Sequence, residues 1–192
     1  MQISNNFPIA KISSQDYLLV ITPNEEVISS VVAFKDKAKE LVGPYPSFNS
    51  KAHITVNHYY NTRSLFFDDR VPVYRSMVSR VESLKIKISG FDFFEHKNSC
   101  TIYAKVELNT DVKSTFFRFR KIFGSDVPEV PHITIARNLS PKQFQILWAY
   151  FKSVKYESTF YATKIDVLKT PTRRFFNERM SLETELELKY LN

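Results

Sequence analysis

The sequence has few of the residues that cross-link a chain, loosen it or anchor it in a membrane. Of its 192 residues, one is cysteine and three are glycine. The single cysteine, Cys100, excludes an internal disulfide and fits a reducing compartment. No run approaches the roughly 20 apolar residues of a membrane-spanning helix, and residues 1–11 lack the basic and apolar regions of a signal peptide. We therefore expect a cytoplasmic protein that neither spans a membrane nor depends on disulfides.

The composition does provide enough apolar residues for a core and a surplus of cations. Apolar residues make up 43% and charged residues an ordinary 24%, so a compact globular protein that needs no protein partner to fold, and is expected to be a monomer, fits best. Lys and Arg outnumber Asp and Glu by 27 to 20. Such an excess attracts phosphate-bearing ligands, although lysines on solvated helix faces would give the same balance.

One order of elements occurs twice along the chain. In the first copy it runs through strand 17–21, the helix N-cap Asn24, an apolar helical stripe from Val27 to Leu41, and strand 52–56. In the second copy it runs through strand 101–106, the N-cap Asn109, a stripe from Val112 to Phe123, a loop with Pro128 and Pro131, and strand 132–136. The repeat predicts two related lobes.

The remaining segments add helices and strands to these lobes. The patterns predict a helix over 69–82, a strand over 84–88 that Gly90 breaks, a helix from Ser140-Pro141, and strands near 158–168 and 181–188. No low-complexity linker separates the halves. We therefore expect a single two-lobed domain over residues 1–192, of the α+β class, with mostly antiparallel sheets and helices packed outside.

Each copy of the repeat ends in the pattern His-x-Thr-aliphatic, at 53–56 and at 132–135. Side chains alternate along a strand, so each His shares a face with its Thr, while the aliphatic residues face the helices. The candidate site residues are His53, Thr55, His132 and Thr134. His-Ile-Thr is a β-prone tripeptide that could be purely structural, but two of only four histidines at equivalent places favour a functional pair.

Two imidazoles and two hydroxyls on one face suit the chemistry of a phosphodiester. Histidine, with an ordinary pKa of about 6.5, can take a proton from water or give one to a departing alkoxide near neutral pH. A threonine hydroxyl can donate a hydrogen bond to a phosphate oxygen. This chemistry requires no metal and no cofactor.

The other two histidines fit this site less well. Five positions beyond His53, His58 is expected on the opposite strand face, and His96 is expected in a polar loop. A metal held by His53, His132 and a carboxylate is the alternative, but the sequence has no HExxH motif and no paired cysteines to support it.

The two motifs resemble those of the 2H phosphoesterase superfamily, in particular its 2'-5' RNA ligase-like, or 2',3'-cyclic phosphodiesterase, branch. The second motif continues as Ala136-Arg137, which is similar to the longer form found in that branch. The resemblance implies a bilobal fold with pseudo-twofold symmetry and a central groove. It also implies that one His activates water, the other protonates the leaving ribose oxygen, and both threonines hold the phosphate. We assign His132 as the base and His53 as the acid.

The resemblance leaves the contacts to the rest of a substrate open. Arg137 could bind phosphate, but three positions after Thr134 it lies on the other strand face if the strand persists. Arg173 and Arg174 could contact an RNA backbone or be solvated loop charges. Phe93, Phe94 and Tyr161 could stack on a base, although core packing explains most of the aromatic residues.

Together the residues and the resemblance predict metal-independent hydrolysis of cyclic phosphodiesters on RNA ends or nucleotides. Ligation of RNA ends through a 2'-5' linkage is the alternative within the same superfamily. A module that binds RNA or phosphate without turnover, or a purely structural repeat, are the alternatives outside it.

Overall fold

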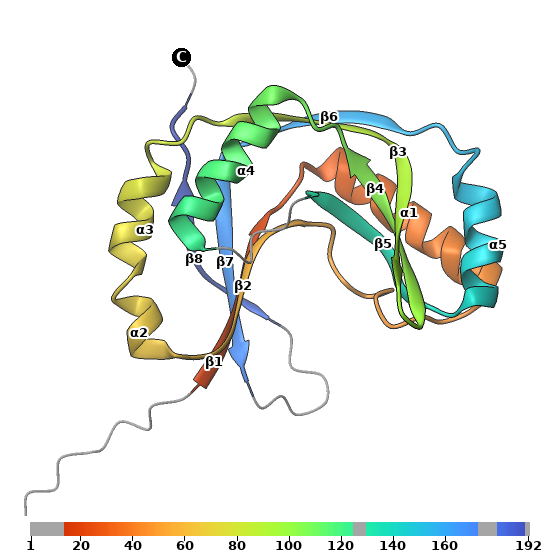
Figure 1. The fold of residues 1–192 in the computed structure, drawn as a ribbon, viewed down its shortest axis with the longest axis horizontal. Coiled ribbons are helices and arrows are strands. Elements are labelled where there is room, and N and C mark those ends of the chain that lie inside the picture. Colours follow the sequence, from red (N-terminus) through yellow and green to blue (C-terminus); the bar gives the residue numbers. More distant parts are fainter. Residues whose placement is uncertain (1–13, 125–129, 173–179, 191–192) are drawn as a thin grey trace, which may run out of the picture.

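The computed structural model describes residues 14–124, 130–172 and 180–190 (Figure 1). In chain order, its elements are β1 (Ser14–Ile21), α1 (Glu25–Val42), β2 (Ile54–Arg63), α2 (Ser64–Asp68), α3 (Val71–Val78), β3 (Leu84–His96), β4 (Ser99–Val106), α4 (Thr110–Phe123), β5 (His132–Leu139), α5 (Pro141–Phe151), β6 (Glu157–Ala162), β7 (Lys164–Pro171) and β8 (Ser181–Glu187). Of these helices, none is long and apolar enough to cross a membrane.

The strands form one continuous sheet in the order β6-β3-β4-β5-β2-β1-β7-β8. Each neighbouring pair in this order is antiparallel. The α+β class with antiparallel strands is therefore confirmed. The two strands that carry the His-x-Thr motifs, β2 and β5, are neighbours at the centre of the sheet.

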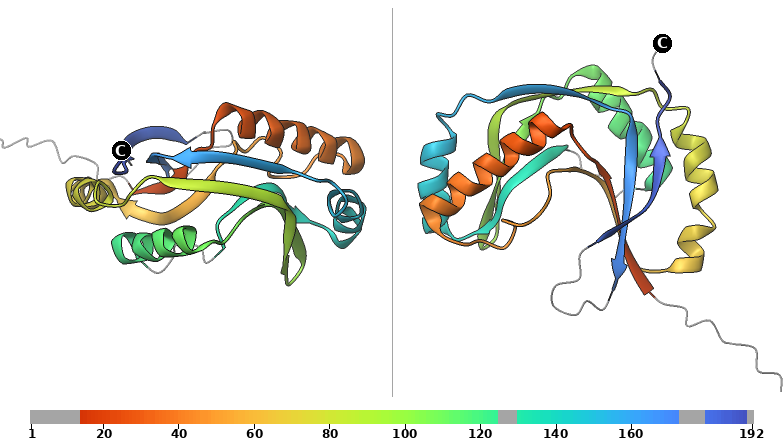
Figure 2. Two further views of the ribbon diagram at one scale, coloured as in Figure 1. Left: turned by 90° about the horizontal axis from the view of Figure 1, so that it is seen from above. Right: turned by 180° about the vertical axis from the view of Figure 1, so that it is seen from behind.

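The helices pack in two groups, one on each half of the continuous sheet (Figures 1 and 2). The first half consists of β1, β2, β7 and β8 with helices α2, α3 and α4, and the second half of β3, β4, β5 and β6 with helices α1 and α5. The two long repeat helices are exchanged between the halves. Helix α1 follows β1 but packs on β5 and α5, and helix α4 follows β4 and, besides contacting β3 of its own half, packs on β2 and α3 of the other half.

Both exchanged helices begin and end in the same way. The side chain of Asn24 accepts a hydrogen bond from the Val27 amide at 3.2 Å, and that of Asn109 accepts one from the Val112 amide at 2.9 Å. Each cap satisfies one of the free amides at a helix start. The two helices end at glycines in the left-handed region, which confirms the predicted repeat of Asn-capped helices.

Aromatic side chains fill the core of each half. In the second half, Phe34 of α1 contacts the rings of Phe91, Phe151 and Tyr156. In the first half, the ring of Tyr74 on α3 contacts those of Tyr59, Phe67 and Phe123. Burial of rings of this size contributes about 2 kcal/mol or more each, so these clusters hold the helices on the sheet.

Several predicted boundaries differ in the structure. Gly90 does not break a strand, since β3 runs on to His96. With a φ of 69°, Gly90 sits where the register between β3 and β4 shifts, so it bends the strand instead. The helix predicted over 69–82 is shorter, and Met77 on it is 39% exposed. The predicted strands near 158–168 separate at Thr163, where the chain passes from the second half to the first.

Candidate active site

The residues of both motifs alternate between the two faces of the sheet, as predicted. Four aliphatic side chains are fully buried in the core: Ile54, Val56, Ile133 and Ile135. The side chains of His53, Thr55, His132 and Thr134 are half-buried. They lie on the face opposite to the one that the helices cover, which we call the open face.

The pairing of β2 with β5 brings the two motifs together. Ile54 and Ile133 are directly paired across the antiparallel strands. In an antiparallel pair, residue numbers increase along one strand as they decrease along the other. His53 therefore lies across from Thr134, and Thr55 lies across from His132. Diagonal neighbours of this kind are about 7–8 Å apart, so both histidines are within reach of one phosphate group.

Both imidazoles are held by the same local contact. The Nδ1 atom of His53 lies 2.8 Å from the carbonyl oxygen of Lys51, and the Nδ1 atom of His132 lies 2.8 Å from that of Val130. A carbonyl can only accept, so Nδ1 carries a proton in each ring. The Nε2 atom is then the nitrogen that exchanges a proton with a substrate.

The surroundings lower the pKa of both histidines. Burial is the main cause in each case, because it disfavours the charged imidazolium, and the hydrogen bond to the carbonyl opposes it. The pKa of His53 is lowered further by the charges of Lys35, His132 and Arg137. The contribution of His132 agrees with the strand pairing, which places the two histidines at diagonal positions.

A β-bulge lies at the last residue of each motif. On β2, Val20 pairs with Thr55 but Leu19 pairs with Asn57, so Val56 is the extra residue. A bulge shifts the alternation of all later side chains by one. Asn57 therefore points to the core, where its side chain donates to the carbonyl of Phe123 at 3.1 Å.

The second bulge repeats this arrangement on β5. Tyr103 pairs with Thr134 but Ile102 pairs with Ala136, so Ile135 is the extra residue. Ala136 is accordingly fully buried next to Ile135. The two strands thus share the bulge as well as the motif.

The bulges correct two predictions about which face a residue occupies. Arg137 was expected on the far face if the strand persisted. The strand persists to Leu139, yet the bulge returns Arg137 to the open face, where it is exposed and its charge lowers the pKa of His53. His58 was also expected on the far face, but it pairs with Leu18 and so shares the face of Thr55. His58 and Arg137 occupy equivalent positions, each five residues after a motif histidine.

Aromatic rings border the second histidine. Phe94 and Tyr103 are stacked with ring centroids 4.3 Å apart, and each lies 5.0 Å from the ring of His132. Burial is the main cause that raises the pKa of Tyr103 to about 12, so its phenol stays protonated at neutral pH and is a poor proton acceptor there. Sequence reasoning considered Phe94 but missed Tyr103, since only the strand pairing places Tyr103 beside His132.

The other candidate residues lie away from the paired motifs or outside the described residues. The Nε2 atom of His96 lies 3.2 Å from the Thr101 hydroxyl at the far end of β3. Phe93 packs on Phe144 and Trp148 in the core, and Tyr161 lies exposed on β6. Arg173 and Arg174 fall in a segment outside the described residues. Within the described ranges, no three His, Cys, Asp or Glu side chains gather as metal ligands do.

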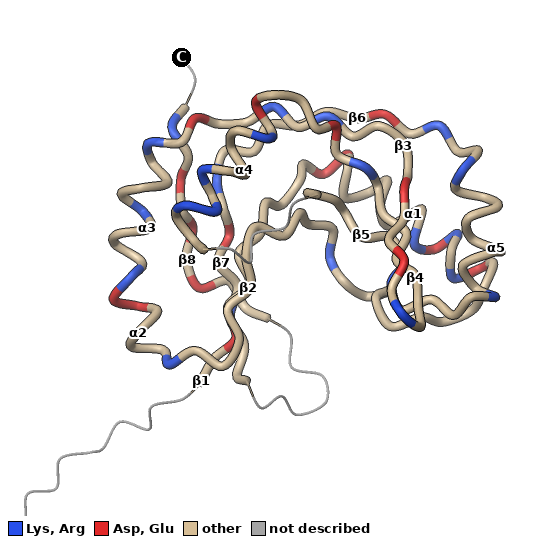
Figure 3. Tube along the Cα trace, viewed as in Figure 1, with Lys and Arg blue, Asp and Glu red and all other residues tan. Residues whose placement is uncertain are grey.

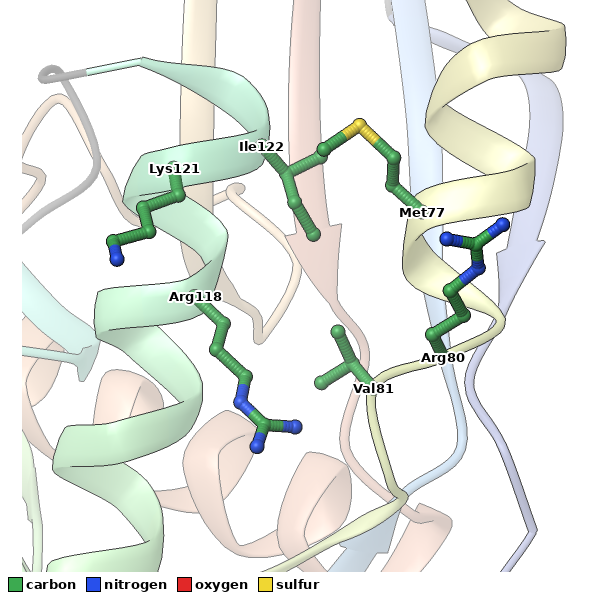
Figure 4. Close-up of a pocket in the computed structure, with 6 residues that line it drawn as sticks. All are labelled: Met77, Arg80, Val81, Arg118, Lys121 and Ile122. Carbon is green, nitrogen blue, oxygen red and sulfur yellow. The ribbon is translucent and has the colours of Figure 1, made fainter.

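A separate hollow between α3 and α4 is lined by both apolar and cationic side chains (Figure 4). Its lining residues are Met77, Arg80, Val81, Arg118, Lys121 and Ile122. These residues include no imidazole or carboxyl group, so the hollow lacks the acid and base that the open face has. Figure 3 shows Lys and Arg spread over the helices of both halves, including the end of α4.

Comparisons with known proteins cover most of the chain. A family model described as the 2'-5' RNA ligase superfamily matches residues 27–174. No curated protein sequence matches the chain significantly.

Solved structures share the fold at low sequence identity. E. coli LigT complexed with 3'-AMP is 14% identical with a TM-score of 0.65, over 91% of this chain and 98% of that chain. TT0787 of Thermus thermophilus is 16% identical with a TM-score of 0.60, over 92% of this chain and 100% of that chain. A protein solved as a phosphoesterase is 13% identical with a TM-score of 0.66, over 92% of this chain and 99% of that chain.

Proposed function

Because the chain belongs to the 2'-5' RNA ligase superfamily of 2H phosphoesterases, we propose that it hydrolyses 2',3'-cyclic phosphates on RNA ends or nucleotides, with His53 and His132 as proton-transfer groups. One observation carries this proposal. Two His-Thr pairs lie side by side on the open face of neighbouring strands, and both histidines are anchored through Nδ1 with Nε2 left for chemistry.

In the proposed reaction, His132 is the general base. Its Nε2 atom takes a proton from a water molecule as the water oxygen forms a bond to phosphorus. The lowered pKa of His132 keeps this ring neutral near pH 7, which is the state that a base needs. A positioned base of this kind contributes about 10²- to 10⁴-fold to the rate.

His53 is the proposed general acid. As the bond between phosphorus and one ribose oxygen breaks, the Nε2 proton of His53 moves to that oxygen and leaves a hydroxyl group. Burial, followed by the charges of Lys35, His132 and Arg137, lowers the pKa of His53, which makes its imidazolium a stronger proton donor. The negative phosphate offsets those charges when the substrate binds, so the ring gains its proton in the complex.

Thr55, Thr134 and Arg137 are the proposed phosphate ligands. The hydroxyls lie on the same face as the imidazoles, and the bulge on β5 brings the guanidinium to that face. Donors fixed before the reaction stabilise negative charge as it builds up on the phosphate. LigT, which shares the fold, has been solved with 3'-AMP and with phosphate, which supports a phosphate or nucleotide as the ligand class.

We propose that residues 1–192 act as one two-lobed unit that needs neither a cofactor nor a protein partner. Each half contributes one histidine, one threonine and one residue five positions after the histidine. Since these groups meet only where β2 and β5 pair, the unit of function is the whole sheet.

Ligation of RNA ends through a 2'-5' linkage is the second candidate, favoured by the description of the family itself. The 5'-hydroxyl of one RNA end would replace water as the nucleophile at the 2',3'-cyclic phosphate of the other end, and the 3'-oxygen would leave and take up a proton, so that a 2'-5' phosphodiester remains. The same two imidazoles would move the protons in either case.

The proposal is tested with purified protein in EDTA. The substrates are an oligonucleotide ending in a 2',3'-cyclic phosphate, a nucleoside 2',3'-cyclic phosphate, and a pair of cleaved RNA halves. We expect ring opening of the cyclic phosphates at a rate unaffected by EDTA. Joined halves without hydrolysis of the cyclic phosphates would identify a ligase instead.

Two further outcomes would overturn the proposal. Turnover that appears only with an added divalent cation would require metal-assisted chemistry. Tight binding of the cyclic phosphates without turnover would identify a binding module.

A further inference from the structure

Lys35 is buried in the core side of α1, where a charged side chain is costly. It is 3% exposed, whereas Lys37 and Lys39 on the same helix reach solvent. An ammonium group loses its hydration when it is buried, and that loss must be offset by hydrogen bonds. The contacts of Lys35 therefore indicate what this residue does.

Three acceptors surround the Lys35 ammonium group, all of them from one turn. They are the carbonyl oxygens of Ser47 and Ser50, at 3.2 and 2.5 Å, and the hydroxyl of Ser50, at 2.8 Å. Three acceptors match the three protons of a charged ammonium group. All three acceptors are uncharged, so they hold the group in place without cancelling its positive charge.

This turn connects to both motifs. Ser50 lies three residues before His53, and the intervening Lys51 supplies the carbonyl that anchors the His53 ring. The Ser47 hydroxyl accepts a hydrogen bond from the Arg137 amide at 2.9 Å, and Ser47 is itself 2% exposed. A single buried cation thus lies under the segment that carries one histidine and beside the strand that carries the other.

We propose that Lys35 is a positioning residue for the two-histidine site, a role that rests on the proposed function. Its ammonium group fixes the turn 46–49 and the segment leading to His53, and through Ser47 that turn holds the backbone at Arg137. Lys35 itself does not touch the substrate. Its loss should misplace the acid, the base being held by separate contacts.

The charge of Lys35 supports this role and provides a measurement for it. Besides burial, the charged groups that lower the pKa of His53 are Lys35 on α1 and His132 and Arg137 on β5. The shift of His132 has burial as its cause, opposed by the Val130 carbonyl. Removing the Lys35 charge should therefore raise the pKa of His53 directly and affect that of His132 only through its coupling to His53.

The test compares Lys35→Met with Lys37→Met in the full chain. Lys37 makes an exposed ion pair with Glu40 that contributes little, so it is the matched control on the same helix. Imidazole proton resonances followed by NMR against pH report each histidine separately. We expect Lys35→Met to raise the pKa of His53, to shift that of His132 less, and to lower kcat/KM on a nucleoside 2',3'-cyclic phosphate by about 10- to 100-fold. Lys37→Met should behave as wild type.

An unchanged pKa of His53 in folded Lys35→Met would overturn the proposal, and so would equal shifts of both histidines. Ser50→Ala is the second variant, because it retains the charge and removes one acceptor. It tests the contact between the Lys35 ammonium group and Ser50, which we call the tether, even if Lys35→Met does not fold. We expect a loss of about threefold to tenfold in kcat/KM with the pKa of His53 still low, and wild-type activity would contradict the tether.

Failure of the proposed function gives a different result. Wild-type protein without turnover on cyclic phosphates would end the hydrolase proposal. The NMR titration would still decide whether Lys35 controls His53.

Discussion

The two halves of the molecule give their histidines the same backbone setting and different neighbours. Each histidine lies at the start of a central strand, His53 just before β2 and His132 as the first residue of β5, is anchored through Nδ1 to a carbonyl two residues earlier, and is followed by a bulge at the same position. Around the rings the halves differ. Cations approach His53 from α1 and β5, whereas the aromatic rings of Phe94 and Tyr103 border His132.

This difference shows how a repeated motif can serve two roles. The repeated backbone fixes where the two nitrogen atoms lie, because strand pairing, anchor and bulge are set by local structure. The unrepeated neighbours control how easily each nitrogen takes up a proton. Two identical side chains in unlike surroundings can then act as an acid and a base in one reaction.

The largest expected effect comes from removing either histidine. His53→Ala and His132→Ala should each lower kcat on a cyclic phosphate by about 10²- to 10⁴-fold, as measured by steady-state kinetics. The comparison becomes sharper with a phosphodiester whose leaving group is p-nitrophenolate. Such a group leaves without a proton, so it should restore much of the activity of His53→Ala and little of that of His132→Ala.

The reverse pattern of rescue would exchange the two roles. Equal rescue of both variants would contradict any division of labour between the halves. Phosphate binding by both variants serves as the control for a correctly folded site.

The next effect in size concerns the threonine hydroxyls. Thr55→Val and Thr134→Val keep the shape of the side chain and remove a donor to the phosphate, so each should lower kcat/KM by about 10- to 100-fold. Because the two threonines lie on equivalent positions, the losses should be similar. A loss confined to one threonine would show that the phosphate sits in one half only.

The pH profile provides a smaller but more specific test. The pKa values of His53 and His132 are both lowered from 6.5, so each ring gives up its proton at a lower pH than an ordinary histidine. The plot of kcat/KM against pH reports the free enzyme. Its basic limb, where the acid loses its proton, should therefore fall below pH 6.5, and the optimum should lie lower still.

An optimum above the ordinary histidine value would mean that the free protein does not hold both rings in the surroundings described. Measurement of kcat at saturating substrate is the companion experiment. Its basic limb should move to higher pH, because bound phosphate stabilises the imidazolium.

The smallest effects are expected where the halves are most alike. Asn24→Ala and Asn109→Ala each remove the side-chain cap of a repeat helix and should lower the free energy of unfolding by about 1 kcal/mol. Urea unfolding measures both. If the losses in the free energy of unfolding differ severalfold, the two helices share their local geometry but not their contribution to stability.

Much of the fold and of the site follows from local pattern, and the rest depends on pairing between distant strands. The Asn caps, the apolar helix stripes and the burial alternation of the two motifs could be predicted, because each depends on neighbouring residues only. The positions of His58 and Arg137 could not. A bulge arises from the register between two strands. Strict alternation of side chains along one strand therefore places the residues after the bulge on the wrong face.

Lys35 escaped prediction for a related reason. Lysine on an amphipathic helix is normally solvated, and its neighbours on α1 follow that rule. The acceptors that make its burial possible lie in a turn some 12 to 15 residues later in the sequence. A signal was present in the repeat, since Lys35 and Arg120 are both 11 positions after the capping asparagine.

The exchange of α1 and α4 between the halves has a consequence for how the chain reaches its native state. Helix α1 packs on β5 of the opposite half, and helix α4 packs on β2 of the opposite half as well as on β3, so a fragment containing one strand-helix unit would lack part of its cover and expose an apolar sheet surface. The chain should consequently unfold in one cooperative step. An ancestral copy of the unit, if it existed alone, would have had to trade helices with a second molecule to become stable.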